Sequence, residues 1–121
     1  MSSKVTLILG ASENPTRYSN LAVKRLLANA FPVVAIGAKA GQIEEIVIET
    51  EQIAFDNIDT ISLYLNPDRQ KEYYNYILAL KPKRLIFNPG TENDELVELA
   101  QQHQIQTVEA CTLVMLSTGQ Y

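Results

Sequence analysis

Cysteine and histidine are almost absent from this sequence, which has one of each, Cys111 and His103, among its 121 residues. A single cysteine cannot build a disulfide framework or a cysteine zinc cluster. A single histidine argues against a histidine-based metal site and against a catalytic triad. We therefore look for function in other residue types. Cys111 is expected to be a small buried apolar residue, and His103 a solvent-facing residue at a helix end.

Long apolar segments are also missing. The apolar runs, such as residues 33–36 and 113–116, are far shorter than the roughly 20 residues needed to span a membrane. The chain starts Met-Ser-Ser-Lys and passes directly into a strand-like run, whereas a signal peptide has a longer apolar region after its basic start. We expect a cytoplasmic protein without a membrane partner.

The sequence has no excess of positive charge, because its formal net charge is −4. Nonspecific nucleic-acid binding needs a basic surface, so we expect no nucleic-acid partner. A small phosphorylated ligand is compatible with this charge, since a few local cations suffice to bind it.

What the sequence does contain is an alternation of short apolar runs with longer amphipathic segments, and its length fits one domain over residues 1–121. The predicted strands are residues 5–9, 32–36, 60–65, 84–87 and 105–109. The predicted helices are residues 20–30, 67–80, 92–102 and 111–117. Residues 37–59 are the least regular stretch, in which residues 46–48 form a short strand or an edge piece.

Continuous apolar strands indicate a sheet that is covered on both faces, and helices between them indicate right-handed crossovers and parallel strands. We predict a doubly wound, three-layer, Rossmann-like α/β fold with a mostly parallel five-stranded sheet. Ligands of such sheets bind beyond the carboxyl ends of the strands, where the strand order reverses. With the common strand order, the loops after Leu9 and Phe87 would meet there.

The first of these loops lacks the dinucleotide fingerprint Gly-x-Gly-x-x-Gly, of which only Gly10 is present. It is about eight residues long, against the usual two to six. Ser19 is predicted to cap the next helix, whose free N–H groups would then form an anion site. Arg17 adds a guanidinium suited to phosphate, and Ser12 and Asn20 add hydrogen-bond donors. The alternative is a surface loop with a capped helix and a solvated arginine.

The end of the second strand discriminates between cofactors. NAD-binding folds place an acid near this point to bind the ribose hydroxyls, but here the first acid is Glu44 and the strand is followed by Lys39. A cation at this position suits a phosphate on the adenosine ribose, as in coenzyme A or NADP. Taken alone, Lys39 is equally well explained as one of ten surface cations.

The second loop contains a turn signal at Pro89 and Gly90, and Thr91 is predicted to cap the following helix. Asn88 either presents its amide to a ligand or serves only the fold. Asn66, after the third predicted strand, is expected to be a plain helix cap.

Three stretches, residues 10–20, 83–93 and 105–111, carry a resemblance through their order and spacing. The first reads Gly-Ala-Ser, then Asn-Pro and Arg-x-Ser, ahead of a helix and a buried strand; the second contains a strand, Asn-Pro-Gly and a Glu-Asn helix start; the third ends at a cysteine. Together they resemble the small bacterial coenzyme-A-binding proteins, which are stand-alone relatives of the N-terminal domain of the succinyl-CoA synthetase alpha chain. The resemblance covers nearly the whole chain.

This resemblance implies a Rossmann-like fold that binds coenzyme A, with the adenosine-diphosphate part along the first loop and the end of the second strand. The matching positions are Gly10, Ser12, Arg17, Ser19 and Lys39. The family often reads Pro-Val-Asn-Pro-Lys or -Arg after the second strand, and residues 35–39 keep the cation but lack the rigid turn. It often has Gln where Asn88 stands. The phosphorylated histidine of the synthetase lies in a second domain and His103 is not its equivalent, so ligase chemistry is not implied.

The sequence thus predicts a non-catalytic carrier or sensor module for coenzyme A or an acyl-CoA, because no nucleophile–base pair, metal cluster or set of convergent carboxylates is apparent. Two alternatives stay open: an NAD(P)-binding oxidoreductase-type domain or subunit that acts with a partner chain, with NADP as its cofactor, and a domain that binds only a protein partner. A homo-oligomer is compatible with either. The predicted cofactor-binding residues are Gly10, Ala11, Ser12, Asn14, Arg17, Tyr18, Ser19, Asn20, Lys39, Asn88, Pro89 and Gly90.

Overall fold

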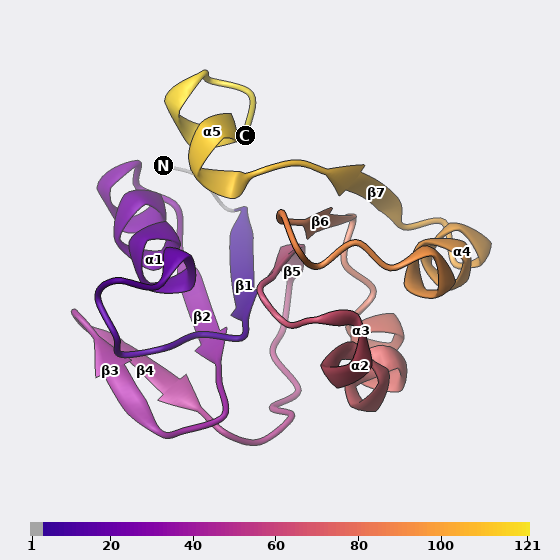
Figure 1. The fold of residues 1–121 in the computed structure, drawn as a ribbon, viewed down its shortest axis with the longest axis horizontal. Helices are drawn as coiled ribbons and strands as arrows, with labels where there is room; N and C mark the ends of the chain where they lie inside the picture. The colour runs from indigo at the N-terminus through magenta and orange to yellow at the C-terminus, as the bar shows by residue number, and fades with distance from the viewer. Residues whose placement is uncertain (1–3) are drawn as a thin grey trace.

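In the computed structural model, which describes residues 4–121, the chain forms a seven-stranded sheet flanked by short helices (Figure 1). The strands are β1 (Val5–Leu9), β2 (Val33–Ile36), β3 (Gly41–Ile43), β4 (Ile46–Glu49), β5 (Ile58–Leu63), β6 (Arg84–Phe87) and β7 (Gln106–Glu109). The helices are α1 (Tyr18–Ala28), α2 (Pro67–Gln70), the 3-10 turn η1 (Lys71–Tyr73), α3 (Tyr74–Leu80), α4 (Asp94–Gln102) and α5 (Thr112–Ser117).

The strand order is β3-β4-β2-β1-β5-β6-β7, and all neighbouring pairs are parallel except β3 with β4. The Rossmann-like α/β class is therefore confirmed, but the prediction of five strands was wrong. The two additional strands both lie in residues 37–59, the stretch that had no clear period. They form a hairpin at the sheet edge, where a helix usually connects two parallel strands. Strands of three and four residues are too short to show an alternation of apolar and polar residues.

The position of β5 corrects the predicted site as well. Without β3, the order is that of the common doubly wound sheet, in which β4 is the third strand of the first half and β5 opens the second half. β5 pairs with β1, with Leu63 opposite Leu9, so the strand order reverses between these two strands. The predicted reversal between the strands that end at Leu9 and Phe87 was wrong, because β6 lies one strand further out. The loop after Leu63 lies beside the loop after Leu9, and the loop after Phe87 contributes Pro89 to the cavity described below.

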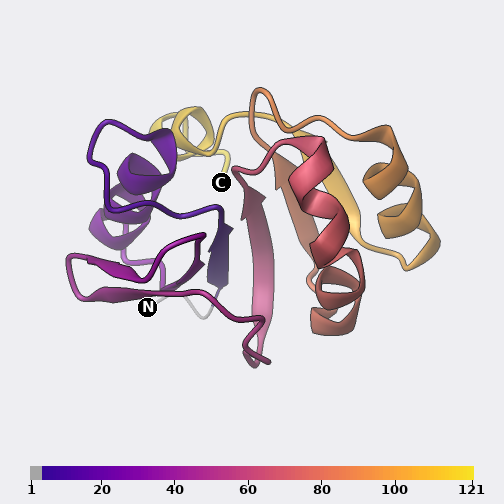
Figure 2. The ribbon, with the colours of Figure 1, turned by 60° about the horizontal axis from the view of Figure 1, so that its bottom comes forward.

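Helices cover both faces of the sheet, as two separate core clusters demonstrate (Figures 1 and 2). On one face, apolar residues of α1 and α5 pack against β1, β2 and the β3–β4 hairpin. On the other, α3 and α4 pack against β1, β5 and β6. This explains why the central strands carry apolar residues on both sides. The consecutive residues Leu7, Ile8 and Leu9, for example, are all fully buried.

Two predicted helix caps are wrong and one is confirmed. α1 begins at Tyr18 with Arg17 as its cap, and Ser19 lies inside the first turn, buried against the core. α4 is capped by Asn93, which accepts hydrogen bonds from the N–H groups of Glu95 and Leu96. Thr91 instead donates its hydroxyl to the carbonyl of Asn88.

Asn66 caps α2 as predicted, since its side chain accepts a hydrogen bond from the N–H of Arg69 at 2.9 Å. His103 is the exposed residue after α4, as expected. Cys111 is a half-buried free thiol at the start of α5, rather than a fully buried one. No helix within residues 4–121 combines the length and the apolar character that crossing a bilayer requires.

Candidate functional site

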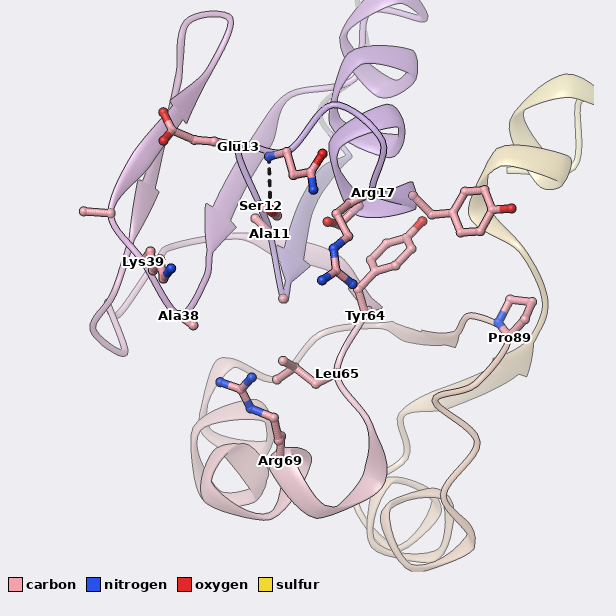
Figure 3. A pocket seen from close by; sticks show the side chains of 15 residues that line it. Ala11, Ser12, Glu13, Arg17, Ala38, Lys39, Tyr64, Leu65, Arg69 and Pro89 are labelled. Atoms are coloured by element: carbon pink, nitrogen blue, oxygen red, sulfur yellow. Dashed lines mark hydrogen bonds between the residues drawn. The ribbon is translucent and has the colours of Figure 1, made fainter.

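A cavity of about 680 Å³ opens beyond the carboxyl ends of β1, β2 and β5 (Figure 3). Its lining comes from the β1–α1 loop, the residues after β2, the residues after β5, and one residue after β6. The lining residues are Gly10, Ala11, Ser12, Glu13, Asn14, Arg17, Tyr18, Ser19, Ala38, Lys39, Ala40, Tyr64, Leu65, Arg69 and Pro89. The cavity therefore lies at the point where the strand order reverses, which is the usual ligand position in this architecture.

The structure gathers the predicted site residues around this cavity, except for Asn20, Asn88 and Gly90. Asn20 is 2% exposed and donates a hydrogen bond from its side-chain amide to the carbonyl of Ser12 at 2.9 Å, so it fixes the first loop to α1. Gly90 lies in the predicted turn with a φ of 91° and is exposed. Both residues shape loops next to the cavity without lining it.

Asn88 is also 2% exposed, and its amide is fully engaged within the fold. Its Nδ2 donates to the Ser62 hydroxyl at 2.8 Å and to the Leu63 carbonyl at 2.9 Å. Its Oδ1 accepts a hydrogen bond from the N–H of Thr112 at 2.8 Å. Of the two roles considered for Asn88, the structure shows the one in the fold: it ties β5, β6 and the start of α5 together.

The β1–α1 loop spans residues 10–17, the predicted eight residues, and its path depends on Gly10. Gly10 has a φ of 104°, and a Cβ added there would lie 2.9 Å from the carbonyl carbon and oxygen of Tyr64. Only glycine adopts this backbone conformation readily while another chain segment passes so close. The N–H groups of Gly10 and Ala11 both donate to the carbonyl of Ile36, at 2.8 and 2.9 Å, which fixes the loop to the end of β2.

The loop ends in a local turn that opens α1 toward the cavity. The side-chain oxygen of Asn14 accepts hydrogen bonds from the N–H and the hydroxyl of Thr16, and its carbonyl accepts from the N–H of Arg17. The Arg17 carbonyl accepts the first hydrogen bonds of the helix, from residues 20 and 21. Within the described residues the N–H groups of Tyr18 and Ser19 thus have no carbonyl partner, and a helix N-terminus of this kind attracts anions.

Three cations line the cavity: Arg17 from the first loop, Lys39 after β2, and Arg69 from α2. All three are exposed, and none of them forms an ion pair with another residue of the described chain. Figure 3 shows Lys39 and Arg17 on one side of the cavity and Arg69 on the opposite side. Three unpaired cations at one site of a chain with a net charge of −4 indicate an anionic ligand.

Glu13 is the one acid among the lining residues. Its Oε2 accepts a hydrogen bond from the N–H of Gln42 in β3 at 2.9 Å, so its carboxylate is directed to the hairpin. The first loop is thereby fastened to the sheet edge. This bond also occupies one N–H of an edge strand, which would otherwise be open to pairing with another chain.

Sequence reasoning missed the lining residues Glu13, Ala38, Ala40, Tyr64, Leu65 and Arg69. The last three follow β5 and were overlooked because this strand was assigned to the first half of the sheet. The signal that could have found them is strand order: had residues 46–49 been counted as the third strand, the loop after Leu63 would have been placed opposite Gly10.

Tyr64 forms part of the cavity wall and stays protonated at physiological pH. Burial raises the pKa of Tyr64 to about 12, against the opposing influence of the Ser62 and Thr112 hydroxyls. Its side chain therefore contributes an aromatic surface and no charge.

Cys111 and His103 do not line the cavity, and the described residues hold no group of three or more His, Cys, Asp or Glu side chains suited to a metal ion. The described lining thus offers cations, hydroxyl groups and an aromatic ring.

Comparison with known proteins adds independent information. A family model described as a CoA binding domain matches residues 4–117. No protein among the curated sequences matches the chain. A solved structure of an uncharacterized protein is 46% identical, superposes with a TM-score of 0.96, and each of the two chains covers 100% of the other.

Two more distant structures share the fold. A hypothetical protein from Pyrococcus horikoshii OT3 is 23% identical over 95% of this chain and 82% of its own length, with a TM-score of 0.85. Acetyl-coenzyme A synthetase 1 of Candidatus Korarchaeum cryptofilum, solved in complex with phosphate and ADP, is 16% identical over 90% of this chain, with a TM-score of 0.75. The similarity extends over only 26% of the synthetase chain.

Proposed function

Because this chain belongs to the CoA binding domain family, we propose that it binds coenzyme A or an acyl-CoA in the cavity beyond the carboxyl ends of β1, β2 and β5. The observation that supports this most is the set of unpaired cations around a cavity that also receives the N-terminus of α1. Coenzyme A carries a diphosphate and a ribose phosphate, so several separate cations fit it better than one.

The lining suggests an orientation for the ligand. The diphosphate would lie at the β1–α1 loop, where the N–H groups of Tyr18 and Ser19 and the Arg17 guanidinium are available. The ribose phosphate would lie toward Lys39, which follows β2. The pantetheine arm would then extend toward Pro89, at the other end of the cavity in Figure 3.

We further propose that the chain is a carrier or sensor module rather than an enzyme. The cavity residues provide cations, hydroxyl groups and aromatic surface, and they do not provide a nucleophile next to a base. A cytoplasmic location, a protein partner and a homo-oligomeric state stay predictions.

Ligand-dependent stabilisation tests this function. We expect coenzyme A to stabilise the protein in thermal unfolding more than dephospho-coenzyme A, NADP or NAD does. At a hundredfold excess over the dissociation constant, the stabilisation should be about 2.7 kcal/mol. The variants Arg17→Ala and Lys39→Glu should reduce it, whereas Arg25→Ala, which removes an exposed cation of α1 outside the cavity, should not. Absence of any stabilisation by coenzyme A, or a preference for NADP, would reject the proposal.

A further inference from the structure

Arg69 is the one cation of the cavity that comes from the second half of the sheet. It lies on α2, directly after β5, while Arg17 and Lys39 follow β1 and β2. In Figure 3 its side chain rises from α2 on the side of the cavity opposite Lys39 and Arg17. A ligand in the cavity would therefore have a cation on each side.

The helix that carries Arg69 is firmly attached to the fold. The N–H of Arg69 donates to the side chain of Asn66 at 2.9 Å, and the preceding Pro67 has a backbone already suited to the first helical turn. The next residue, Gln70, is 0% exposed, and its Nε2 donates to the carbonyls of Leu65 and Thr91 at 2.8 Å each. Its Oε1 accepts a hydrogen bond from Asn93 at 2.9 Å. The backbone of Arg69 is thus fixed between a capped N-terminus and a buried amide.

The guanidinium of Arg69 is available to a ligand. The neighbouring acid, Asp68, forms its ion pair with Lys71 at 3.9 Å, and among the described residues no carboxylate forms an ion pair with Arg69. The side chain is exposed and lines the cavity, whereas Lys71 lies outside it. Of these two neighbouring basic residues, Lys71 pairs with Asp68 outside the cavity, whereas Arg69 is unpaired and lines it.

We propose that Arg69 is a third phosphate-binding residue, which binds a phosphoryl group of coenzyme A from the second half of the fold and thereby makes both halves contact the ligand. This inference rests on the proposed function. The planar guanidinium can donate two parallel hydrogen bonds to one phosphoryl group, which a lysine cannot do. The phosphoryl group is either the ribose phosphate, shared with Lys39, or the diphosphate, shared with Arg17.

Titration calorimetry with coenzyme A tests this assignment on the full chain. Arg69→Ala should weaken binding about tenfold, in the range expected for a charge-assisted hydrogen bond. Arg69→Lys should recover part of the loss, and the affinity of Arg69→Ala should depend less on ionic strength than that of the wild type. Lys71→Ala is the matched control, because it removes the same charge nearby but outside the cavity, and it should leave binding within about twofold of wild type. Unfolding in urea should show that all three variants keep their stability.

Dephospho-coenzyme A then identifies the phosphoryl group. A loss in Arg69→Ala for coenzyme A alone assigns the ribose phosphate, and an equal loss for both ligands assigns the diphosphate. If the wild type binds coenzyme A and Arg69→Ala binds it as tightly as Lys71→Ala does, this inference is wrong while the proposed function stands. If the wild type does not bind coenzyme A, both are wrong.

Discussion

Asn88 shows how one buried amide can decide the geometry of a neighbouring site. It joins the Ser62 hydroxyl, the Leu63 carbonyl and the N–H of Thr112, and Ser62 is also hydrogen-bonded to the Thr112 hydroxyl at 2.7 Å. Leu63 is the residue before Tyr64, so this network sets where the chain leaves β5 and enters the cavity wall. Asn88 thus shapes the cavity wall without lining the cavity.

Replacement of Asn88 by alanine should be costly for the fold. Asn88→Ala leaves a buried N–H and a buried carbonyl without their partner, and the free energy of unfolding should fall by about 2 to 3 kcal/mol. Urea unfolding measures this change. Asn14→Ala, which removes an exposed amide of the first loop, should lower stability much less. Unchanged stability of Asn88→Ala together with lost ligand binding would instead place Asn88 in direct contact with the ligand.

Glu13 has an opposite electrostatic effect to the three cations. Its carboxylate is held at β3 by the N–H of Gln42, yet it is part of the cavity lining and repels a phosphorylated ligand. Glu13→Gln keeps an oxygen acceptor for Gln42 and removes the charge. We expect this variant to bind coenzyme A about two- to threefold more tightly, with the difference vanishing at high ionic strength. Calorimetry at two salt concentrations measures it, and weaker binding would mean that the charge itself is needed.

At the scale of elements, the interior strands of the sheet were easier to predict than the hairpin at its edge. The strands at residues 5–9 and 84–87 were predicted with the observed bounds, because each contains a continuous apolar run, residues 7–9 and 85–87, that is fully buried. Of the β3–β4 hairpin, only residues 46–48 were named, as a short strand or an edge piece, because the hairpin is short, lies at the sheet edge and includes the exposed Val47 and Gln42. Leaving it out of the strand order put the predicted reversal one strand too far along the sheet, at β6 in place of β5.

The residues of the candidate site also differ in how far the sequence could predict them. The loop residues around Gly10 and Arg17 were predictable, since a long loop after the first strand of a doubly wound sheet is recognisable from sequence. Tyr64, Leu65 and Arg69 were not, because their place at the cavity depends on which strand pairs with β1. The buried position of Ser19 depends on the turn at Asn14, which starts the helix two residues earlier than a cap at Ser19 would.

The attachment of α2 gives a prediction at this scale. Asn66→Ala removes the acceptor for the Arg69 N–H and should lower the free energy of unfolding by about 1 kcal/mol. Because the cap fixes the turn that carries Arg69, binding of coenzyme A should weaken as well, whereas Asn66→Asp or Asn66→Ser should preserve both properties. Thermal unfolding and calorimetry on the same samples measure the two effects. A normal affinity in Asn66→Ala would show that Gln70 alone suffices to position α2.

The tyrosines connect local burial to the behaviour of the whole molecule. Desolvation is the main cause that raises the pKa of five of the six tyrosines, Tyr64, Tyr73, Tyr74, Tyr76 and Tyr121, above the ordinary value of 10.0. For Tyr64 and Tyr76 the pKa reaches about 12. The Tyr76 hydroxyl also donates a hydrogen bond to the carbonyl of Ile53, which only the neutral phenol can do. These side chains belong to the core clusters on both faces of the sheet, so their ionisation affects the stability of both clusters.

The fold should consequently lose stability at alkaline pH. A folded-state pKa above that of the unfolded chain means that the unfolded state releases its proton first, so the stabilisation is complete below pH 10 and disappears as the pH rises toward 12. Tyr64 and Tyr76 should each lower the free energy of unfolding by at most about 1.4 kcal/mol per pH unit within this window. Urea unfolding between neutral and alkaline pH measures the loss, and tyrosinate absorbance reports the ionisation. Tyr76→Phe should be less stable at neutral pH, through its missing hydrogen bond, but should show a shallower alkaline decline. Tyrosines that all ionise near pH 10 in a protein that stays folded would contradict this account, because buried phenols cannot lose a proton at their ordinary pKa without a compensating charge or solvent.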